Sequence, residues 1–135
     1  MRGGVDHIDL TVKDAVASRP FYQAVLNFMG YAIGQIYPDG ACDFDRVGGV
    51  FCSIGIRSEG GPNAGRAHDR YTSGLHHLAW RAESRADVDA LHALLLEIGA
   101  QVLDPPADYP QYAPGYYAVF FADPDGLKLE YVHRP

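Results

Sequence analysis

The strongest constraint on the fold is an internal repeat. The segment HIDLTV near the start of the chain matches HLAWRA in its middle, with His7 on His77, a displacement of 77 − 7 = 70 residues. Further along, NFMGYAI matches LEIGAQV with Gly30 on Gly99, a displacement of 99 − 30 = 69 residues. Register held within one residue across a whole helix predicts two copies of one supersecondary module.

Each copy has the same predicted order of elements, which is strand, helix, strand, strand, strand. In the first copy, residues 5–12 alternate between apolar and polar side chains, and His7 lies on the polar face. Ser18 and Pro20 predict a helix that begins near residue 19, and Gly30 predicts its end. Further strands are predicted at 31–37, 41–47 and 50–57, separated by glycine-containing turns.

The second copy begins with a strand predicted at 74–82. Ser84 and Asp87 form a capping-box-like start, and Gly99 marks the helix end. The apolar stripe of this helix consists of Val88, Leu91, Leu95 and Ile98. A short strand at 101–103 precedes the loop DPPADYPQYAPG, and two strands close the chain.

This pattern predicts an α+β fold built from two tandem βαβββ modules. Module one is predicted at residues 1–57 and module two at 74–135, within a single domain of 135 residues. The intervening residues 58–73 are rich in Gly, Ser, Asn and charged side chains and show no periodicity, which is typical of a linker.

Composition restricts the class of partner. The net charge is −6 and the pI about 5.3, without a cluster of Lys and Arg, which argues against nucleic acid. No apolar stretch approaches the ~18 residues of a membrane-spanning helix. Strand-like sequence begins almost at once, which leaves no room for a signal peptide, so we expect a cytoplasmic protein. Cys42 and Cys52 are too few for a disulfide framework and are expected to be free thiols.

One carboxylate in the last predicted strand needs an explanation. Glu130 lies in LKLEYV on the face opposite Leu127, Leu129 and Tyr131. Strands are depleted in Glu, and a half-buried carboxylate needs a partner. Glu130 is therefore the first candidate for a functional residue.

The motif DPDG-x-x-x-E at residues 123–130, together with the histidine that opens each module, resembles the vicinal oxygen chelate superfamily. That group includes glyoxalase I, bleomycin-resistance proteins, thiol transferases for fosfomycin and extradiol dioxygenases. The resemblance spans essentially the whole chain. It implies a glyoxalase-like fold in which the two modules form a cupped mixed sheet around a metal-binding cleft.

The resemblance also implies a set of metal ligands. His7 and His77 match the ligands in the first strand of each module, and Glu130 matches the final carboxylate. His76 is expected to point toward the helix layer. Ser53 is expected to match Glu130 in module one, where a serine is a poor ligand, so the set is two histidines and one glutamate. Such a set leaves open positions on Fe, Mn or Ni, and it also suits Zn with a bound water.

Other residues are candidates for binding substrate or for supporting the ligands. Asp9 and Arg81 share the expected cleft face with the ligands, although an ordinary ion pair at the rim explains them equally well. Tyr116 shares that face too, and Ser53 belongs to the same group. The tyrosines around residues 109–117 are expected to form an aromatic wall or to serve packing alone. Beyond the metal ligands, no catalytic residue is assigned except, as a candidate, Glu130 itself.

The resemblance implies a metal-dependent enzyme that acts on a small molecule with two adjacent oxygens. Dioxygenase, lyase or isomerase and thiol transferase reactions all remain open. The alternative is a metal-free protein that sequesters a ligand, as bleomycin-resistance proteins do. A homodimer is expected in either case, with the paired modules supplied by one chain or exchanged between two.

Overall fold

The computed structural model describes residues 2–135, which form two compact units. Unit 1 ends at Arg66 and unit 2 begins at Ala67, a boundary that falls inside the predicted linker. Unit 1 contains β1 (His7–Val12), α1 (Ala15–Phe28), β2 (Tyr31–Ile36), β3 (Cys42–Arg46) and β4 (Ser53–Ser58). Unit 2 contains β5 (Leu78–Arg81), α2 (Arg85–Glu97), β6 (Gln101–Asp108), β7 (Tyr117–Ala122) and β8 (Lys128–His133).

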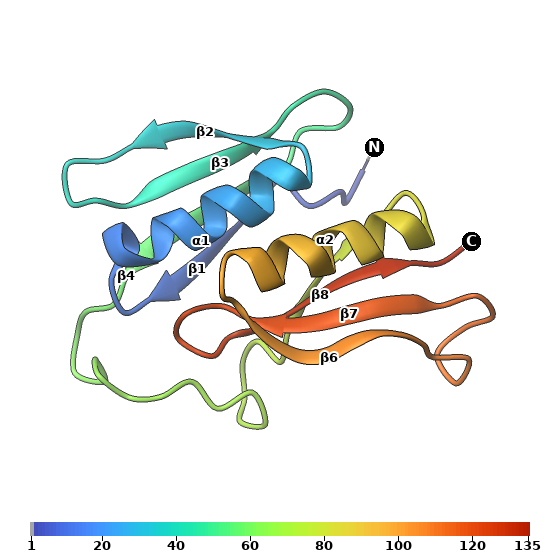
Figure 1. The fold of residues 1–135 in the computed structure, drawn as a ribbon. Helices are drawn as coiled ribbons and strands as arrows, with labels where there is room; N and C mark the ends of the chain where they lie inside the picture. The colour runs from blue at the N-terminus through green and yellow to red at the C-terminus, as the bar shows by residue number, and fades with distance from the viewer. Residues whose placement is uncertain (1) are drawn as a thin grey trace. The chain divides into compact units, whose positions relative to one another are not determined.

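Each unit is one four-stranded mixed sheet with one helix on it (Figure 1). The strand order is β1-β4-β3-β2 in unit 1 and β5-β8-β7-β6 in unit 2, which is the same order in both copies. The first and last strands of each unit pair in parallel, and the other pairs are antiparallel. The predicted α+β fold of two tandem βαβββ modules is therefore confirmed.

Alternation of apolar and polar side chains decides which face of each sheet the helix covers. In unit 1, apolar side chains of β1, β3 and β4 are buried on the helix side, among them Leu10, Phe44 and Ile54. In unit 2, Phe121, Leu129 and the helix residue Leu91 are likewise buried. Because successive side chains point to opposite faces, the polar residues of the same strands are left on the face away from the helix.

The first helix begins earlier than the sequence predicts. Asp14, rather than Ser18, caps α1, since its carboxylate accepts hydrogen bonds from the backbone N–H groups of Val16 and Ala17. Pro20 consequently lies inside the helix. The prediction for the second helix is better, because Ser84 caps α2 and accepts from the Asp87 N–H. Gly30 and Gly99 follow the two helices with φ of 88° and 69°, as a left-handed stop requires.

The strand β6 is longer than predicted. It continues through Asp108 and includes two prolines that were expected to belong to a loop. Proline is tolerated there because β6 is an edge strand, and its register shifts twice, between Val102 and Asp104 and between Asp104 and Ala107. In contrast, β5 is shorter than predicted and starts only at Leu78, so His76 and His77 lie in the segment before the strand.

Two further expectations concern the membrane and the cysteines. Within residues 2–135, neither helix has the length and apolar character needed to cross a bilayer. Cys42 is buried and Cys52 partly buried, and both are free thiols, which confirms that expectation.

Candidate functional site

Strand register shows which residues of the two units correspond. In unit 1, His7 is paired with Ser53 and Asp9 with Gly55. In unit 2, Ala79 is paired with Glu130. When His7 is matched to His77, Asp9 matches Ala79, so the counterpart of Glu130 is Gly55. The predicted match of Ser53 to Glu130 is therefore wrong by two residues, because a comparison of β4 with β8 alone does not fix the register of each strand against its neighbour.

Glu130 is the centre of the polar cluster in unit 2. It is only 2% exposed, and both of its carboxylate oxygens have partners. The Tyr116 hydroxyl donates to Oε1, and His77 Nε2 lies 3.0 Å from Oε2. Burial, together with the hydrogen bond to Glu130, raises the pKa of Tyr116, so that hydroxyl stays protonated as a donor. Neither partner is a fixed cation, so the negative charge of Glu130 is buried without full compensation.

A second histidine, His76, contacts the ring of His77. The Nδ1 atoms of His76 and His77 lie 2.7 Å apart, so one of them must carry the hydrogen and the other must accept it. A neutral His77 that donates from Nε2 to Glu130 has a free lone pair at Nδ1, and His76 is then the donor. Partial desolvation of the ring, with a smaller contribution from His77, lowers the pKa of His76. His76 is exposed and contacts the Tyr71 ring, so its expected direction toward the helix layer is wrong.

Aromatic rings surround this cluster within unit 2. The ring of Tyr109 stacks on Tyr112 at 5.7 Å and meets Phe120 edge-on at 5.4 Å, and Tyr112 meets Tyr116 at 5.3 Å. Tyr109, Tyr116 and Leu103 also pack against the buried side chains of Ala118, Phe120 and Val132. Tyr117 is not part of this group, because its hydroxyl donates to Asp89 on α2. The aromatic neighbourhood limits the access of water to Glu130.

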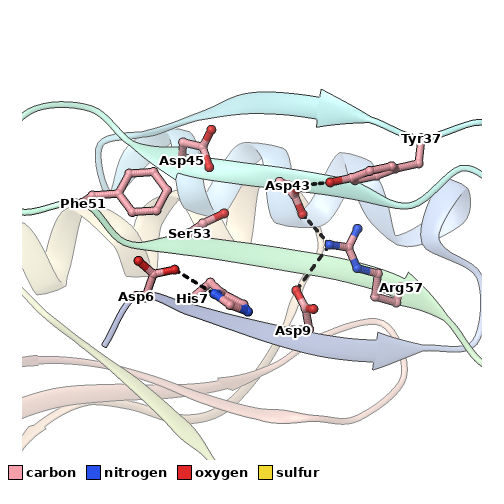
Figure 2. A pocket seen from close by; sticks show the side chains of 9 residues that line it. All are labelled: Asp6, His7, Asp9, Tyr37, Asp43, Asp45, Phe51, Ser53 and Arg57. Atoms are coloured by element: carbon pink, nitrogen blue, oxygen red, sulfur yellow. Dashed lines mark hydrogen bonds and ion pairs between the residues drawn. The ribbon is translucent and has the colours of Figure 1, made fainter. Parts of the chain in front are cut away.

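Unit 1 has an open pocket of about 290 Å³ on the sheet face away from α1. Figure 2 shows its side chains in two groups. At one end of the pocket lie Asp9, Tyr37, Asp43 and Arg57, and at the other lie Asp6, His7, Asp45, Phe51 and Ser53. The lining of the pocket therefore contains four carboxylates and a single guanidinium. The pocket is strongly acidic, which matches the sign of the whole chain.

The first group is a closed ion-pair network. Arg57 Nη2 lies 2.7 Å from Asp43 Oδ1 and 3.4 Å from Asp9 Oδ1, and its guanidinium lies 4.8 Å from the Tyr37 ring centre. The Tyr37 hydroxyl donates to Asp43 at 2.7 Å, and this bond raises the pKa of Tyr37. Gly55 leaves room for the network, since a Cβ there would lie 2.0 Å from Asp9 Oδ1.

The second group contains the predicted ligand His7. Its Nδ1 lies 2.8 Å from Asp6 Oδ1, and this hydrogen bond raises the pKa of His7. A carboxylate on Nδ1 leaves Nε2 as the nitrogen available for a further partner. Ser53, paired with His7 across the strands, is 7% exposed and lines the pocket.

Each unit brings together some of the predicted site residues. His77, Glu130 and Tyr116 form one hydrogen-bonded cluster in unit 2, whereas His7, Asp9 and Ser53 line the pocket of unit 1. Arg81 takes part in neither, and its side chain donates to the Arg134 carbonyl at 3.4 Å. Among residues 2–135, no group of three or more His, Cys, Asp and Glu side chains is arranged to hold a metal ion.

Several pocket residues were not singled out from the sequence. Asp43 and Asp45 flank the buried Phe44 in the strand CDFDR, so alternation alone places both carboxylates on the face away from the helix. That signal was available in the sequence. Arg57 could not be found in this way, because its role depends on neighbouring strands rather than on its own.

Comparison with known proteins agrees with this geometry. The model of the Glyoxalase/Bleomycin resistance protein/Dioxygenase superfamily matches residues 4–131. The chain is 35% identical over 127 residues to the uncharacterized protein YqjT of Bacillus subtilis (strain 168), which covers 93% of this chain and 95% of that protein.

Two solved structures give the same result. A glyoxalase-like protein from Bacillus halodurans is 26% identical with a TM-score of 0.81, covering 98% of this chain and 97% of that chain. A glyoxylase/bleomycin resistance protein/dioxygenase domain from Frankia sp. EAN1pec is 25% identical with a TM-score of 0.75, covering both chains completely at 100%. With two βαβββ modules and a family match over nearly its whole length, the chain belongs to the glyoxalase/bleomycin resistance protein/dioxygenase superfamily.

Proposed function

We propose that this protein is a divalent-metal-dependent enzyme of the glyoxalase/dioxygenase type, with His7, His77 and Glu130 as metal ligands. Its substrate is a small molecule that presents two adjacent oxygens to the metal. The observation that carries the proposal is the contact of 3.0 Å between His77 Nε2 and Glu130 Oε2.

That distance fits a shared metal. The contact brings an imidazole nitrogen and a carboxylate oxygen close enough that one ion could be held by both. The pair also has the right chemistry, because imidazole with carboxylate suits Fe, Mn, Ni and Zn. His7 contributes the third ligand through Nε2, since its Nδ1 is bonded to Asp6. Carboxylate-bound histidines of this kind are common among metal ligands.

The charge of Glu130 supports the same conclusion. Within residues 2–135, no Lys or Arg side chain lies within ion-pair distance of this buried carboxylate, and its ion-pair partner there is His77. A buried charge without a cation is costly, and a divalent ion would offset it.

A bound metal would supply Lewis acidity toward the substrate oxygens. The residues of the chain would do the rest. The Tyr116 hydroxyl donates a hydrogen bond that orients the Glu130 carboxylate. The raised pKa of Tyr116 keeps this hydroxyl protonated. Tyr109 and Phe120 form apolar walls that restrict water. Substrate tests distinguish dioxygenation, isomerisation and thiol transfer.

One observation favours the second candidate, a metal-free protein that sequesters a ligand. Both Glu130 oxygens already have hydrogen-bond partners, so the cluster is satisfied without a metal. A sequestering protein would use the aromatic and acidic faces for binding alone. Like the enzyme, it is proposed to be a homodimer, which analytical ultracentrifugation tests.

Metal analysis separates the two candidates. Protein purified without chelator should contain about one metal ion per chain by elemental analysis, and Glu130→Ala should lose it. Glu97→Gln, which removes an exposed carboxylate from α2, is the matched control and should keep the metal. Full occupancy in Glu130→Ala would overturn the ligand assignment, and a wild-type protein that binds no added Fe, Mn, Ni or Zn would favour sequestration. Turnover of catechols with Fe(II) in air, compared with glutathione adducts of methylglyoxal under Ni(II), then separates the reaction classes.

A further inference from the structure

The second group of pocket residues in unit 1 contains polar atoms that no part of the described chain uses. Asp45, Ser53 and His7 form a row across three adjacent strands, because Ser53 is paired with both of the others. All three line the pocket, and Phe51 lies at the same end (Figure 2). The row therefore presents a carboxylate, a hydroxyl and an imidazole side by side, next to an aromatic ring.

Ser53 is the first residue that points to a binding site here. The residue is more than nine-tenths buried, with 7% exposed. Within residues 2–135 its hydroxyl has no hydrogen-bond partner, and the side chain lines the pocket. The hydroxyl oxygen itself is not among the fully buried unpaired atoms of the described chain, so it is open to the pocket and a bound donor can reach it.

Asp45 is the second such residue. Among the residues that the structure describes, no cation and no hydrogen-bond donor pairs with its carboxylate. The carboxylate lies over Gly34, where a Cβ would come within 2.3 Å of Asp45 Oδ2. A glycine in mid-strand costs stability, and here it makes room for the charged group at the pocket.

The other end of the pocket shows how this surface holds a cation. There the Arg57 guanidinium lies 2.7 Å from Asp43 and 4.8 Å from the centre of the Tyr37 ring. The Asp45 end has the same two components, a carboxylate and the ring of Phe51, which is 52% exposed. Within residues 2–135 this end has no Lys or Arg side chain, and its one basic group, His7, is paired with Asp6 rather than with Asp45.

We propose that the Asp45 end of this pocket binds the cationic head of an organic small molecule, a primary ammonium or a guanidinium. Asp45 is the counter-ion, the Ser53 hydroxyl accepts one N–H, and the Phe51 ring contacts the apolar carbons beside the charge. Anionic ligands are disfavoured, because the single guanidinium of the pocket is already paired with two carboxylates. This inference goes beyond the proposed function, since it uses unit 1 alone and holds with or without a metal.

The test uses full-length protein stripped of metal with chelator. Binding of three probes of similar size is measured by calorimetry and by shifts of backbone amide resonances: phenethylamine, 2-phenylethanol and 3-phenylpropanoate. We expect phenethylamine alone to bind, with the largest shifts at Asp45 and Ser53. Affinity should fall about tenfold in Asp45→Asn, as expected when a charge-assisted hydrogen bond is lost. It should fall a few-fold in Ser53→Ala.

Glu97→Gln is the matched control, because it removes one negative charge from an exposed helix position in unit 2. Its affinity for phenethylamine should equal that of the wild type. Thermal unfolding of each variant checks that the fold is intact. Equal binding of the amine and the alcohol, unchanged affinity in Asp45→Asn, or equal losses in Asp45→Asn and Glu97→Gln would each overturn the proposal. Amine binding that requires added metal would overturn it too, whereas failure of the metal proposal alone would leave amine binding intact.

Discussion

The open faces of the two sheets differ sharply although the sheets share one topology. Unit 1 presents carboxylates around a guanidinium, and unit 2 presents one buried carboxylate among aromatic rings. The difference is clearest at one matched pair, Gly55 and Glu130. At Gly55 the missing side chain admits the Asp9–Arg57 ion pair, while at Glu130 the carboxylate bonds to Tyr116 and His77. The two units therefore share one backbone topology, and substitutions at single matched positions give their sheet faces different chemistry.

The largest predicted effect tests whether the buried faces are as equivalent as the strand order suggests. Phe44 and Phe121 occupy matched positions, opposite Ile54 and Leu129, and both are fully buried. Replacing either by Ala should cost about 3–5 kcal/mol of unfolding free energy, because each leaves a cavity under a helix. Urea denaturation measures both. A loss below about 1 kcal/mol in only one variant would show that the two cores are packed differently.

The next prediction tests whether Gly55, rather than Ser53, is the counterpart of Glu130. If the metal proposal holds, Gly55→Glu in an Asp9→Ala background, where the Asp9 carboxylate no longer occupies that space, should tighten Ni²⁺ binding about tenfold relative to Asp9→Ala, which is ~1.4 kcal/mol, by adding a charged ligand. Ser53→Glu should not. Calorimetry with Ni²⁺ compares each variant with its parent protein, and tighter binding only in Ser53→Glu would restore the match predicted from sequence.

A smaller change in stability is expected from the contact between the last strand of each sheet and the helix that covers it. Tyr131 donates its hydroxyl to Asp87 on α2 at 2.5 Å, whereas its counterpart in unit 1 is the apolar Ile56. Tyr131→Phe should cost about 1 kcal/mol of unfolding free energy, the usual contribution of one hydrogen bond. Ile56→Val, a matched small change, should cost a similar amount through packing. A Tyr131→Phe variant as stable as wild type would show that the bond contributes nothing.

The smallest effect separates the histidines by pH. The hydrogen bond that His7 donates to Asp6 raises the pKa of His7. This bond therefore stabilises the fold fully below about pH 6.5, and its contribution is lost as pH rises through the raised value. Partial desolvation lowers the pKa of His76, so the unfolded chain binds more protons there, and stability rises with pH between the lowered value and about 6.5. Histidine resonances titrated by NMR measure both. Asp6→Asn should bring the His7 value down while leaving His76 unchanged, and an unmoved His7 would contradict the assignment.

Much of the fold could be predicted because it depends on local patterns. The alternation in HIDLTV, the helix stops at Gly30 and Gly99, and the repeat offset between His7 and His77 each reflect the chemistry of nearby residues. The errors have physical causes as well. Asp14, rather than Ser18, caps α1. Prolines are tolerated in β6 because it is an edge strand.

The sequence by itself determined the two modules, the strand faces and the choice of His7, His77 and Glu130 as candidates. The modules and the strand faces follow from periodicity and residue type, which are properties of a few adjacent positions, whereas the set of His7, His77 and Glu130 is what the resemblance to a known family implies. Only the tertiary structure decided that Glu130 corresponds to Gly55 and that Tyr116 and His77 are its partners. Register between strands far apart in the chain is set by the packing of whole sheets, and no single strand contains that information.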